Sequence, residues 1–220
     1  MITVAFINPN STAMMTKSCA ASFQENLPEN FDVIPITNLS APPAIQGPKD
    51  GEVAVPGVLE IISSNKCDAY VIGCFDDTGL SSARTLTTKP IIGIGQAAYH
   101  LASLMSARFN ILTTLAVSVP VIEENIKTIG FKNVCDGVFA SGVPVLELEN
   151  QPEVSCQKIG EHIKNISNEF PSNAIVLGCA GMTNLWNKLQ NEFETQLIDP
   201  VAAAAKLIPI VTTKSNFCKR

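Results

Sequence analysis

Residues 68–74, Asp68-Ala69-Tyr70-Val71-Ile72-Gly73-Cys74, form an apolar run that ends at a glycine and a cysteine. The pattern returns 105 residues later as Asn173-Ala174-Ile175-Val176-Leu177-Gly178-Cys179. A second pair of positions has the same offset, because Asn8 follows one strand-like segment and Thr113 follows another. A repeat of this length indicates a duplicated domain, since the units of solenoid proteins are shorter. The chain is therefore predicted to have two similar halves, each with one polar strand end and one strand-end cysteine.

Strand-like and helix-like segments alternate along both halves, which is typical of parallel sheets with helices on both faces. The segment Ile2–Ile7 is apolar almost throughout, as expected of a strand buried on both faces. The predicted fold class is α/β, with two similar doubly wound parallel-sheet domains related by a pseudo-twofold axis. The first domain is predicted to comprise residues 1–95 and 201–220, and the second residues 96–200, with the active site in the cleft between them. Residues 201–213 are expected to cross back to the first half.

Periodicity and turn residues predict the individual elements. The proline-rich stretch Ala41–Pro48 is predicted to be a long loop, and such loops are often functional. The helix over residues 152–170 is expected to turn Val154, Ile159, Ile163 and Ile166 inward. The other predicted helices are 11–27, 55–64, 80–86, 96–107, 118–129, 183–192 and 201–207, and the other strands are 32–37, 69–74, 91–94, 109–112, 137–145 (strand or loop), 174–179 and 197–198.

The composition excludes several classes of protein. The chain has 220 residues, 46% of them hydrophobic, and a formal net charge of −5 with scattered Lys and Arg, which argues against a nucleic-acid groove. We find no apolar run of membrane-spanning length and no secretion signal, so a cytoplasmic protein without a membrane segment is expected. Seven cysteines without a Cys-x-x-Cys motif indicate reduced thiols. Only His100 and His162 are present, both in helix-like stretches, so neither a metal site nor a histidine-based hydrolase triad is predicted.

The two strand-end cysteines suggest acid–base chemistry. In open parallel sheets, ligands bind beyond the carboxyl ends of the strands, where Asn8, Cys74, Thr113 and Cys179 are predicted to lie. Loop N–H groups and helix N-termini are expected to lower the pKa of both thiols. With a thiol on each face of a substrate carbon, one thiolate can remove a proton and the other thiol can return one from the opposite side. This inverts the stereocentre, and no cofactor is required if the site stabilises the enolate.

Each of these residues also has a structural interpretation. Free cysteines are often simply buried, asparagines form turns, and strand-end hydroxyls bond to nearby backbone. Asp76 and Asp77 could form a solvated turn or a helix cap, and Asp199 could cap the last helix. The matched pair of cysteines favours the functional interpretation of Cys74 and Cys179. The remaining cysteines are interpreted as structural: Cys19, Cys67, Cys135, Cys156 and Cys218.

With these motifs the sequence resembles the Asp/Glu racemase superfamily and, within it, the hydantoin/allantoin racemases. Gly-Cys-Phe-Asp-Asp together with Gly-Cys-Ala-Gly-Met is the specific part of the match. In the glutamate and aspartate racemases, an Asn-Thr or Asn-Ser usually follows the first cysteine, whereas Phe75-Asp76 follows it here. The matching segments are Asn8-Pro9-Asn10-Ser11, Gly73 to Leu80, Thr113-Thr114-Leu115 with Ser118-Val119-Pro120, Leu177 to Met182, and Ile198-Asp199-Pro200-Val201.

The resemblance implies cofactor-independent inversion at C5 of a hydantoin ring, most naturally that of allantoin in purine degradation, with Cys74 and Cys179 as the two bases and no metal. It also implies a homo-oligomer with a small hydantoin-type substrate as its partner. Asn8, Asn10, Thr113 and N–H groups near the cysteines would hold the ring. The full set of implied substrate-binding residues is Asn8, Asn10, Ser11, Ile45, Phe75, Asp77, Gly79, Gln96, Thr113, Thr114, Ala180, Gly181, Met182, Asp199 and Pro200.

Two positions depart from the family pattern. The family usually has glutamate where this chain has Gln46 and Gln96, which predicts a change of charge near the site. The alternatives are an altered or inactive protein that binds ureides or hydantoins, an amino-acid racemase, a maleate isomerase and an arylmalonate decarboxylase. The second cysteine argues against the decarboxylases, which use one thiol. Polarimetry of (S)- and (R)-allantoin would distinguish a racemase from a binding protein.

Overall fold

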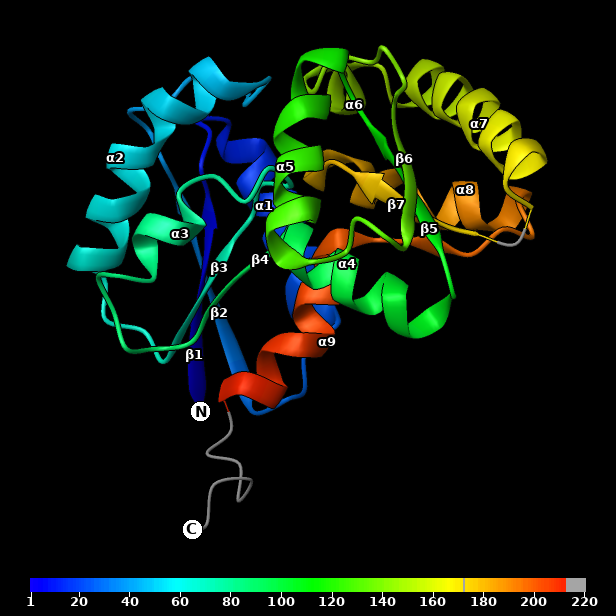
Figure 1. Ribbon diagram of the computed structural model, residues 1–220. Helices are drawn as coiled ribbons and strands as arrows, with labels where there is room; N and C mark the ends of the chain where they lie inside the picture. The colour runs from blue at the N-terminus through cyan, green and yellow to red at the C-terminus, as the bar shows by residue number, and fades with distance from the viewer. Residues whose placement is uncertain (172, 213–220) are drawn as a thin grey trace, which may run out of the picture.

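The computed structural model describes residues 1–171 and 173–212 and contains two four-stranded parallel sheets (Figure 1). The first sheet has the order β2-β1-β3-β4 and the second β6-β5-β7-β8, so equivalent strands occupy equivalent places. This confirms the predicted α/β fold class. The strands are β1 Ile2–Asn8, β2 Phe31–Thr37, β3 Ala69–Ile72, β4 Ile91–Gly93, β5 Phe109–Thr113, β6 Cys135–Ala140, β7 Ala174–Gly178 and β8 Leu197–Ile198.

Helices follow the strands in both halves and cover the sheets (Figure 1). Two short 3₁₀ segments, Ala116–Ser118 and Ala180–Leu185, lead into α5 and α8. The α-helices are α1 Ala13–Glu25, α2 Pro48–Ser64, α3 Leu80–Ala83, α4 Ile94–Met105, α5 Val119–Ile129, α6 Glu147–Asn150, α7 Pro152–Glu169, α8 Trp186–Glu192 and α9 Pro200–Thr212.

The two central strand pairs share one register. Ile7 of β1 lies opposite Ile72 of β3, and Leu112 of β5 lies opposite Leu177 of β7, which is the same pairing 105 residues later. All residues of β3, β5 and β7 are buried, because helices cover both faces of these strands. Because of this shared register, Cys74 follows β3 beside Asn8 at the end of β1, and Cys179 follows β7 beside Thr113 at the end of β5.

Three local predictions were wrong. Helix α2 begins at Pro48, seven residues before the predicted start, since a proline fits the first turn of a helix. Val154 of α7 is 46% exposed, because the buried stripe of that helix runs through Ser155 instead. The helix predicted from Thr183 begins as an α-helix only at Trp186, because residues 180–185 form a 3₁₀ segment.

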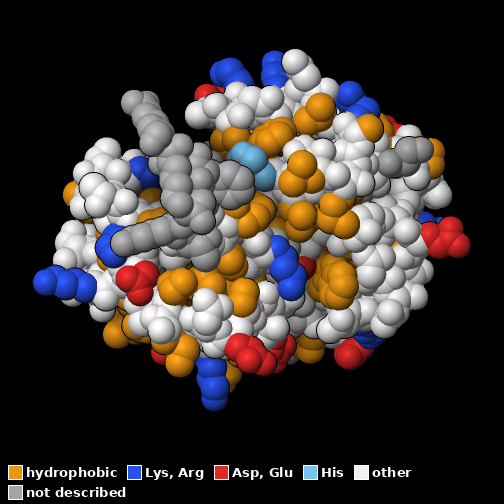
Figure 2. All heavy atoms as spheres, turned by 90° about the horizontal axis from the view of Figure 1, so that it is seen from below, with side chains coloured by type: hydrophobic (Ala, Val, Ile, Leu, Met, Phe, Trp, Pro, Cys, Tyr) orange, Lys and Arg blue, Asp and Glu red, His pale blue; other side chains and the backbone are white. Residues whose placement is uncertain are grey.

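Helix α9 returns to the first half of the chain and packs against α1 and α4, in the lower middle of Figure 1. Figure 2, which views the molecule from below, shows hydrophobic side chains gathered on this face. Leu104 of α4 and Ile210 and Val211 of α9 are exposed and line one groove between these helices. No helix among the described residues is long and apolar enough to cross a membrane. Cys218 and the other residues of 213–220 lie outside the described residues, and the predicted domain boundaries remain a prediction.

Candidate active site

Both strand-end cysteines line one cavity, at the carboxyl ends of the central strands of the two sheets. Of the sequence-predicted residues, eight lie in its wall: Asn10, Ile45, Cys74, Phe75, Thr113, Thr114, Cys179 and Ala180. Six further residues complete the wall: Met15, Gly73, Asp76, Ser118, Val145 and Gly178.

Cys74 follows β3 and receives two hydrogen bonds at its sulfur. The Thr78 hydroxyl donates to Sγ over 3.4 Å, and the backbone N–H of Asp76 is the second donor. Burial nevertheless raises the pKa of the Cys74 thiol well above its usual range, and the charge of Asp76 raises it further. The expectation of a lowered thiol pKa was therefore wrong, because burial outweighs the loop donors.

Cys179 has an equivalent environment after β7. The backbone N–H groups of Gly181 and Met182 donate to its sulfur, and burial raises its pKa to about 12, with Asp76 adding to the rise. In both loops, the N–H two residues after the cysteine is one of the donors. The two thiols are thus weak acids whose conjugate thiolates would be strong bases, each with donors already in place to receive a negative charge.

Asn8 and Thr113 hold the loops beside the cysteines. The Asn8 side chain donates to Asn10 Oδ1 over 2.8 Å and to Thr16 Oγ1 over 3.0 Å, so it orders the loop that brings Asn10 into the wall. The Thr113 hydroxyl donates to the carbonyl oxygen of Gly178 over 3.0 Å. Asn8 itself lies behind the wall, whereas Thr113 is part of it.

Two predicted substrate-binding carboxylates serve as helix caps. Asp77, at φ 52°, accepts the N–H groups of Gly95 over 3.0 Å and Gln96 over 2.7 Å, at the start of α4. Asp199 accepts the Thr183 hydroxyl over 2.8 Å and the N–H of Val201 over 2.9 Å, at the start of α9. These bonds match the helix-cap interpretation of both residues, and neither residue lines the thiol cavity.

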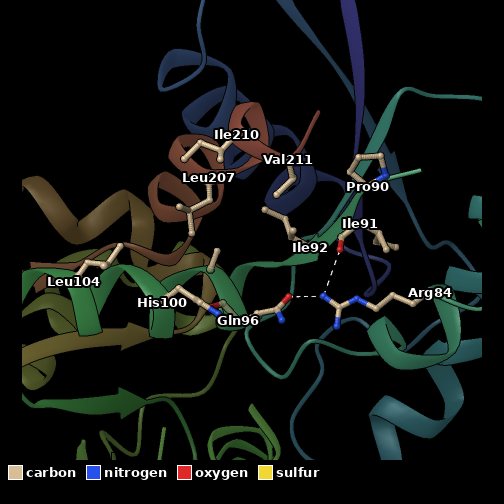
Figure 3. Close-up of a pocket in the computed structure, with 11 residues that line it drawn as sticks. Arg84, Pro90, Ile91, Ile92, Gln96, His100, Leu104, Leu207, Ile210 and Val211 are labelled. Carbon is tan, nitrogen blue, oxygen red and sulfur yellow. Dashed lines mark hydrogen bonds between the residues drawn. The ribbon is translucent and has the colours of Figure 1, made fainter. Parts of the chain in front are cut away.

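Gln96 lies in a different groove, about 420 Å³ in volume, between the end of β4, α4 and α9 (Figure 3). Its Oε1 accepts a hydrogen bond from Arg84, a role that the carboxylate of a glutamate could also fill. Neither cysteine of the thiol cavity lines this groove. The remaining predicted residues also lie outside the wall of the thiol cavity: Ser11, Gly79, Gly181, Met182 and Pro200.

Asp76 is the titratable wall residue that the predicted set of site residues leaves out. It lies in the cavity wall, and burial raises its pKa to about 7, while a hydrogen bond from Ser118 opposes the rise. The Asn125 side chain of α5 donates to the Asp76 carbonyl oxygen over 3.0 Å. Its position two residues after Cys74 could have indicated a site residue, but the neighbouring Asp77 was an equally plausible carboxylate by sequence alone.

The cavity is small. Its volume is about 30 Å³, room for about two water molecules when each needs roughly 10–15 Å³ by this measure. Ile45 and Val145 form part of the wall, and Gln46 joins their segments by accepting the Val145 N–H at Oε1 over 3.2 Å. Because this volume is too small for a substrate ring, we expect these segments to move apart when a substrate binds.

The Gln46 bond is expected to control access to Cys74. Gln46→Ala should raise the rate of Cys74 alkylation by iodoacetamide about fivefold, since one net hydrogen bond is worth about 1 kcal/mol. Gln46→Glu keeps an acceptor oxygen and should alkylate like the unchanged protein. The rate is measured by mass spectrometry of the labelled Cys74 peptide, and equal rates in all three proteins would show that this bond does not limit access.

The comparisons with known proteins show the family and the fold of the chain. Residues 4–208 match the family described as Asp/Glu/Hydantoin racemase. A hydantoin racemase of Rhizobium meliloti is 40% identical over 207 residues, which cover 93% of this chain and 86% of that protein. The solved allantoin racemase of Klebsiella pneumoniae has a TM-score of 0.91 at 34% identity, covering 96% of this chain and 87% of that one. The allantoin racemase of Pseudomonas fluorescens has the same TM-score at 25% identity, covering 95% of this chain and 90% of that one.

Proposed function

The chain belongs to the Asp/Glu/hydantoin racemase family and is a racemase, and from this we propose that it inverts C5 of 5-substituted hydantoins without a cofactor. Cys74 and Cys179 are the two bases, and allantoin is the expected natural substrate. The observation that carries the proposal is that both thiols line one cavity, from equivalent strand ends of the two halves. The solved allantoin racemases of the same fold support this substrate class.

The raised thiol pKa values suit the removal of a proton from carbon. The C5–H of a hydantoin is a weak acid, so a strongly basic thiolate is needed to remove its proton. One thiolate takes the C5 proton and leaves an enolate, and the thiol on the other face delivers its own proton to C5. N–H groups of the two cysteine loops and the Asn10 and Thr114 side chains of the wall can hold the ring amides and carbonyls.

The charge of the cavity favours a neutral ring over an amino acid or a dicarboxylate. Among the wall residues that the structure describes, none is Lys, Arg or His, and Asp76 is an acid. A substrate carboxylate would meet no cation there and would be repelled when Asp76 is ionised. This disfavours an amino-acid racemase, a maleate isomerase and an arylmalonate decarboxylase.

Polarimetry tests the proposed activity. The optical rotation of (S)-allantoin and of (R)-allantoin should each decay to zero with the protein, faster than the spontaneous rate, without change in allantoin concentration. If both enantiomers and a second 5-substituted hydantoin keep their rotation while binding is measurable by calorimetry, the chain is a binding protein instead.

The mechanism predicts independence from metals and dependence on thiols. Activity should survive exhaustive EDTA treatment, since the proposed steps need only acid–base groups. Iodoacetamide should inactivate the enzyme, and a bound hydantoin should slow the inactivation by covering the thiols. Loss of activity in EDTA that zinc or manganese restores would point to a metal site, and alkylation unaffected by ligand would place the reactive cysteine elsewhere.

Self-association is also expected. The apolar side chains of Leu104, Ile210 and Val211 are exposed around the groove between α4 and α9, and such patches often mark contacts between subunits. Light scattering should therefore report a homo-oligomer, and a monomer at every concentration would contradict this.

The reduced thiols that the reaction needs suit the predicted cytoplasmic location.

A further inference from the structure

We propose that Asp76 is a third acid–base group of the racemase site, which accepts the proton of the Cys74 thiol and so generates the thiolate. This inference rests on the proposed function but extends it, because the two-thiol mechanism leaves Asp76 without a role. Asp76 is the only carboxyl residue in the cavity wall as the structure describes it.

Asp76 is held in the cavity from both halves of the molecule. Its backbone N–H donates to the sulfur of Cys74, and the charge of its carboxylate acts on both thiols. Ser118 hydrogen-bonds its carboxylate, and Asn125 of α5 holds its carbonyl oxygen over 3.0 Å. Asp77, by contrast, accepts hydrogen bonds from N–H groups at the start of α4 with both carboxylate oxygens. Of the two adjacent carboxylates, Asp76 is therefore the one free to exchange a proton in the site.

The order of ionisation favours Asp76 as the resting carrier of negative charge. Four titratable groups interact with it: Cys74 and Asp77 on its own loop, Tyr99 of α4, and Cys179 after β7. The pKa of Asp76 is raised by burial only to about 7, whereas burial raises that of Cys179 to about 12 and that of Cys74 at least as strongly. Near neutral pH, the first proton to leave the cavity is thus that of Asp76, and both thiols stay protonated.

The proton then moves in a closed cycle of constant charge. The Asp76 carboxylate takes the proton of Cys74 Sγ, and the resulting thiolate takes the C5 proton, which leaves an enolate. The Cys179 thiol gives its proton to the opposite face of C5 and becomes a thiolate. Asp76 returns its proton to Cys179, so that the site again holds one carboxylate and two thiols. The cavity carries one negative charge throughout, shared with the enolate while it exists, and no external acid or base is consumed.

Asp76→Asn separates this role from a purely electrostatic one, because the two make opposite predictions. The substitution keeps the shape but removes the charge that raises both thiol pKa values, so alkylation of the substrate-free protein should become faster at a given pH. If the charge were the only influence of Asp76, racemisation would also become faster. If Asp76 accepts the thiol proton, racemisation at pH 7 should instead fall at least 30-fold.

The pH profile of kcat/KM provides the second readout. The unchanged enzyme should gain activity as pH rises through about 7, where Asp76 loses its proton, and the apparent pKa belongs to the coupled site as a whole. In Asp76→Asn, this ascending limb should move to alkaline pH, where a thiol ionises unaided. Ser118→Ala removes a hydrogen bond that favours the ionised form of Asp76. The ascending limb of its pH profile should therefore move to higher pH, by less than in Asp76→Asn. Asp32→Asn removes one charge at an exposed site and should leave both readouts unchanged.

Three results would overturn the inference. Asp76→Asn could racemise as fast as the unchanged enzyme at pH 7, or its activity could fall equally at every pH, which would indicate a structural role. Alkylation could also be unaffected by the substitution, which would show that the charge of Asp76 does not act on the thiols. This last measurement needs no substrate, so it remains decisive if no hydantoin is racemised. If circular dichroism shows that Asp76→Asn does not fold, the pH profile of Ser118→Ala is the test. An ascending limb at the same pH as in the unchanged enzyme would then overturn the proposal.

Discussion

Cys74→Ser and Cys179→Ser should each abolish racemisation, with kcat reduced at least 1000-fold. A serine hydroxyl is far less acidic than even a buried thiol, so it cannot supply the missing base or the missing proton near neutral pH. The loops should be preserved in both variants, because serine is close to cysteine in size. Polarimetry with each allantoin enantiomer measures the loss, and circular dichroism checks the fold.

Each serine variant should still exchange the C5 hydrogen of one enantiomer. One thiol remains in each variant, on one face of the substrate carbon, and it can remove and return a proton on that face. NMR of deuterium incorporation in D₂O, corrected for spontaneous exchange, should show that the two variants prefer opposite enantiomers. If both exchange the same enantiomer, or either still racemises at the original rate, the assignment of one thiol to each face is wrong. Cys156→Ser, outside the cavity, is the matched control and should leave activity unchanged.

Gly95→Ala should cause the second large effect, on stability and activity together. A Cβ atom at Gly95 would lie 2.2 Å from the backbone carbonyl oxygen of Phe75 and 3.1 Å from a carboxylate oxygen of Asp77. Since a backbone oxygen cannot rotate away, the loop that carries Cys74 and Asp76 must shift and lose its bonds to α4. We expect the free energy of unfolding to fall by about 3 kcal/mol, at the upper end for overpacking. Racemisation should fall at least 100-fold.

Gly51→Ala is the matched control for this substitution. Gly51 also lies in the first turn of a helix, but a Cβ atom there would meet only Thr78 Cγ2 at 3.9 Å. Alanine is the better helix former, so this variant should be as stable as the unchanged protein, or more stable by up to about 1 kcal/mol. Urea unfolding measures both variants. A Gly95→Ala protein with an unchanged midpoint would show that the loop after Cys74 can adapt without cost.

The repeated strand ends could be predicted from the sequence because their pattern is local and periodic. Ile72-Gly73-Cys74 and Leu177-Gly178-Cys179 each end a continuous apolar run, and short runs of this kind that end at a glycine are typical of strands buried on both faces. The rule that parallel strands present their carboxyl ends at one edge then predicts that Asn8, Thr113 and the two cysteines lie together. The structure places Thr113 and both cysteines in one cavity wall, whereas Asn8 lies behind the wall and hydrogen-bonds Asn10, which is part of it.

Only the tertiary structure decided which of two adjacent carboxylates faces the cavity. Asp76 and Asp77 differ by one position in the sequence, but the left-handed backbone at Asp77 directs its side chain to the start of α4 and leaves Asp76 in the cavity wall. That conformation depends on α4, which begins 17 residues further along the chain. Gln96 likewise lies in the groove beside Arg84, because the packing of α4 and α9 determines which way its side chain points.

The acidity of the two thiols was also decided by tertiary packing. The sequence shows the loop donors that lower a thiol pKa, and those donors are present at Cys74 and Cys179. It does not show how deeply the thiols are buried, because residues distant in the sequence, such as Ile45 and Val145, about 30 and 70 residues from Cys74, form part of the wall around them. Burial acts through every atom that surrounds a group, so its balance against local hydrogen bonds emerges only when the chain is folded.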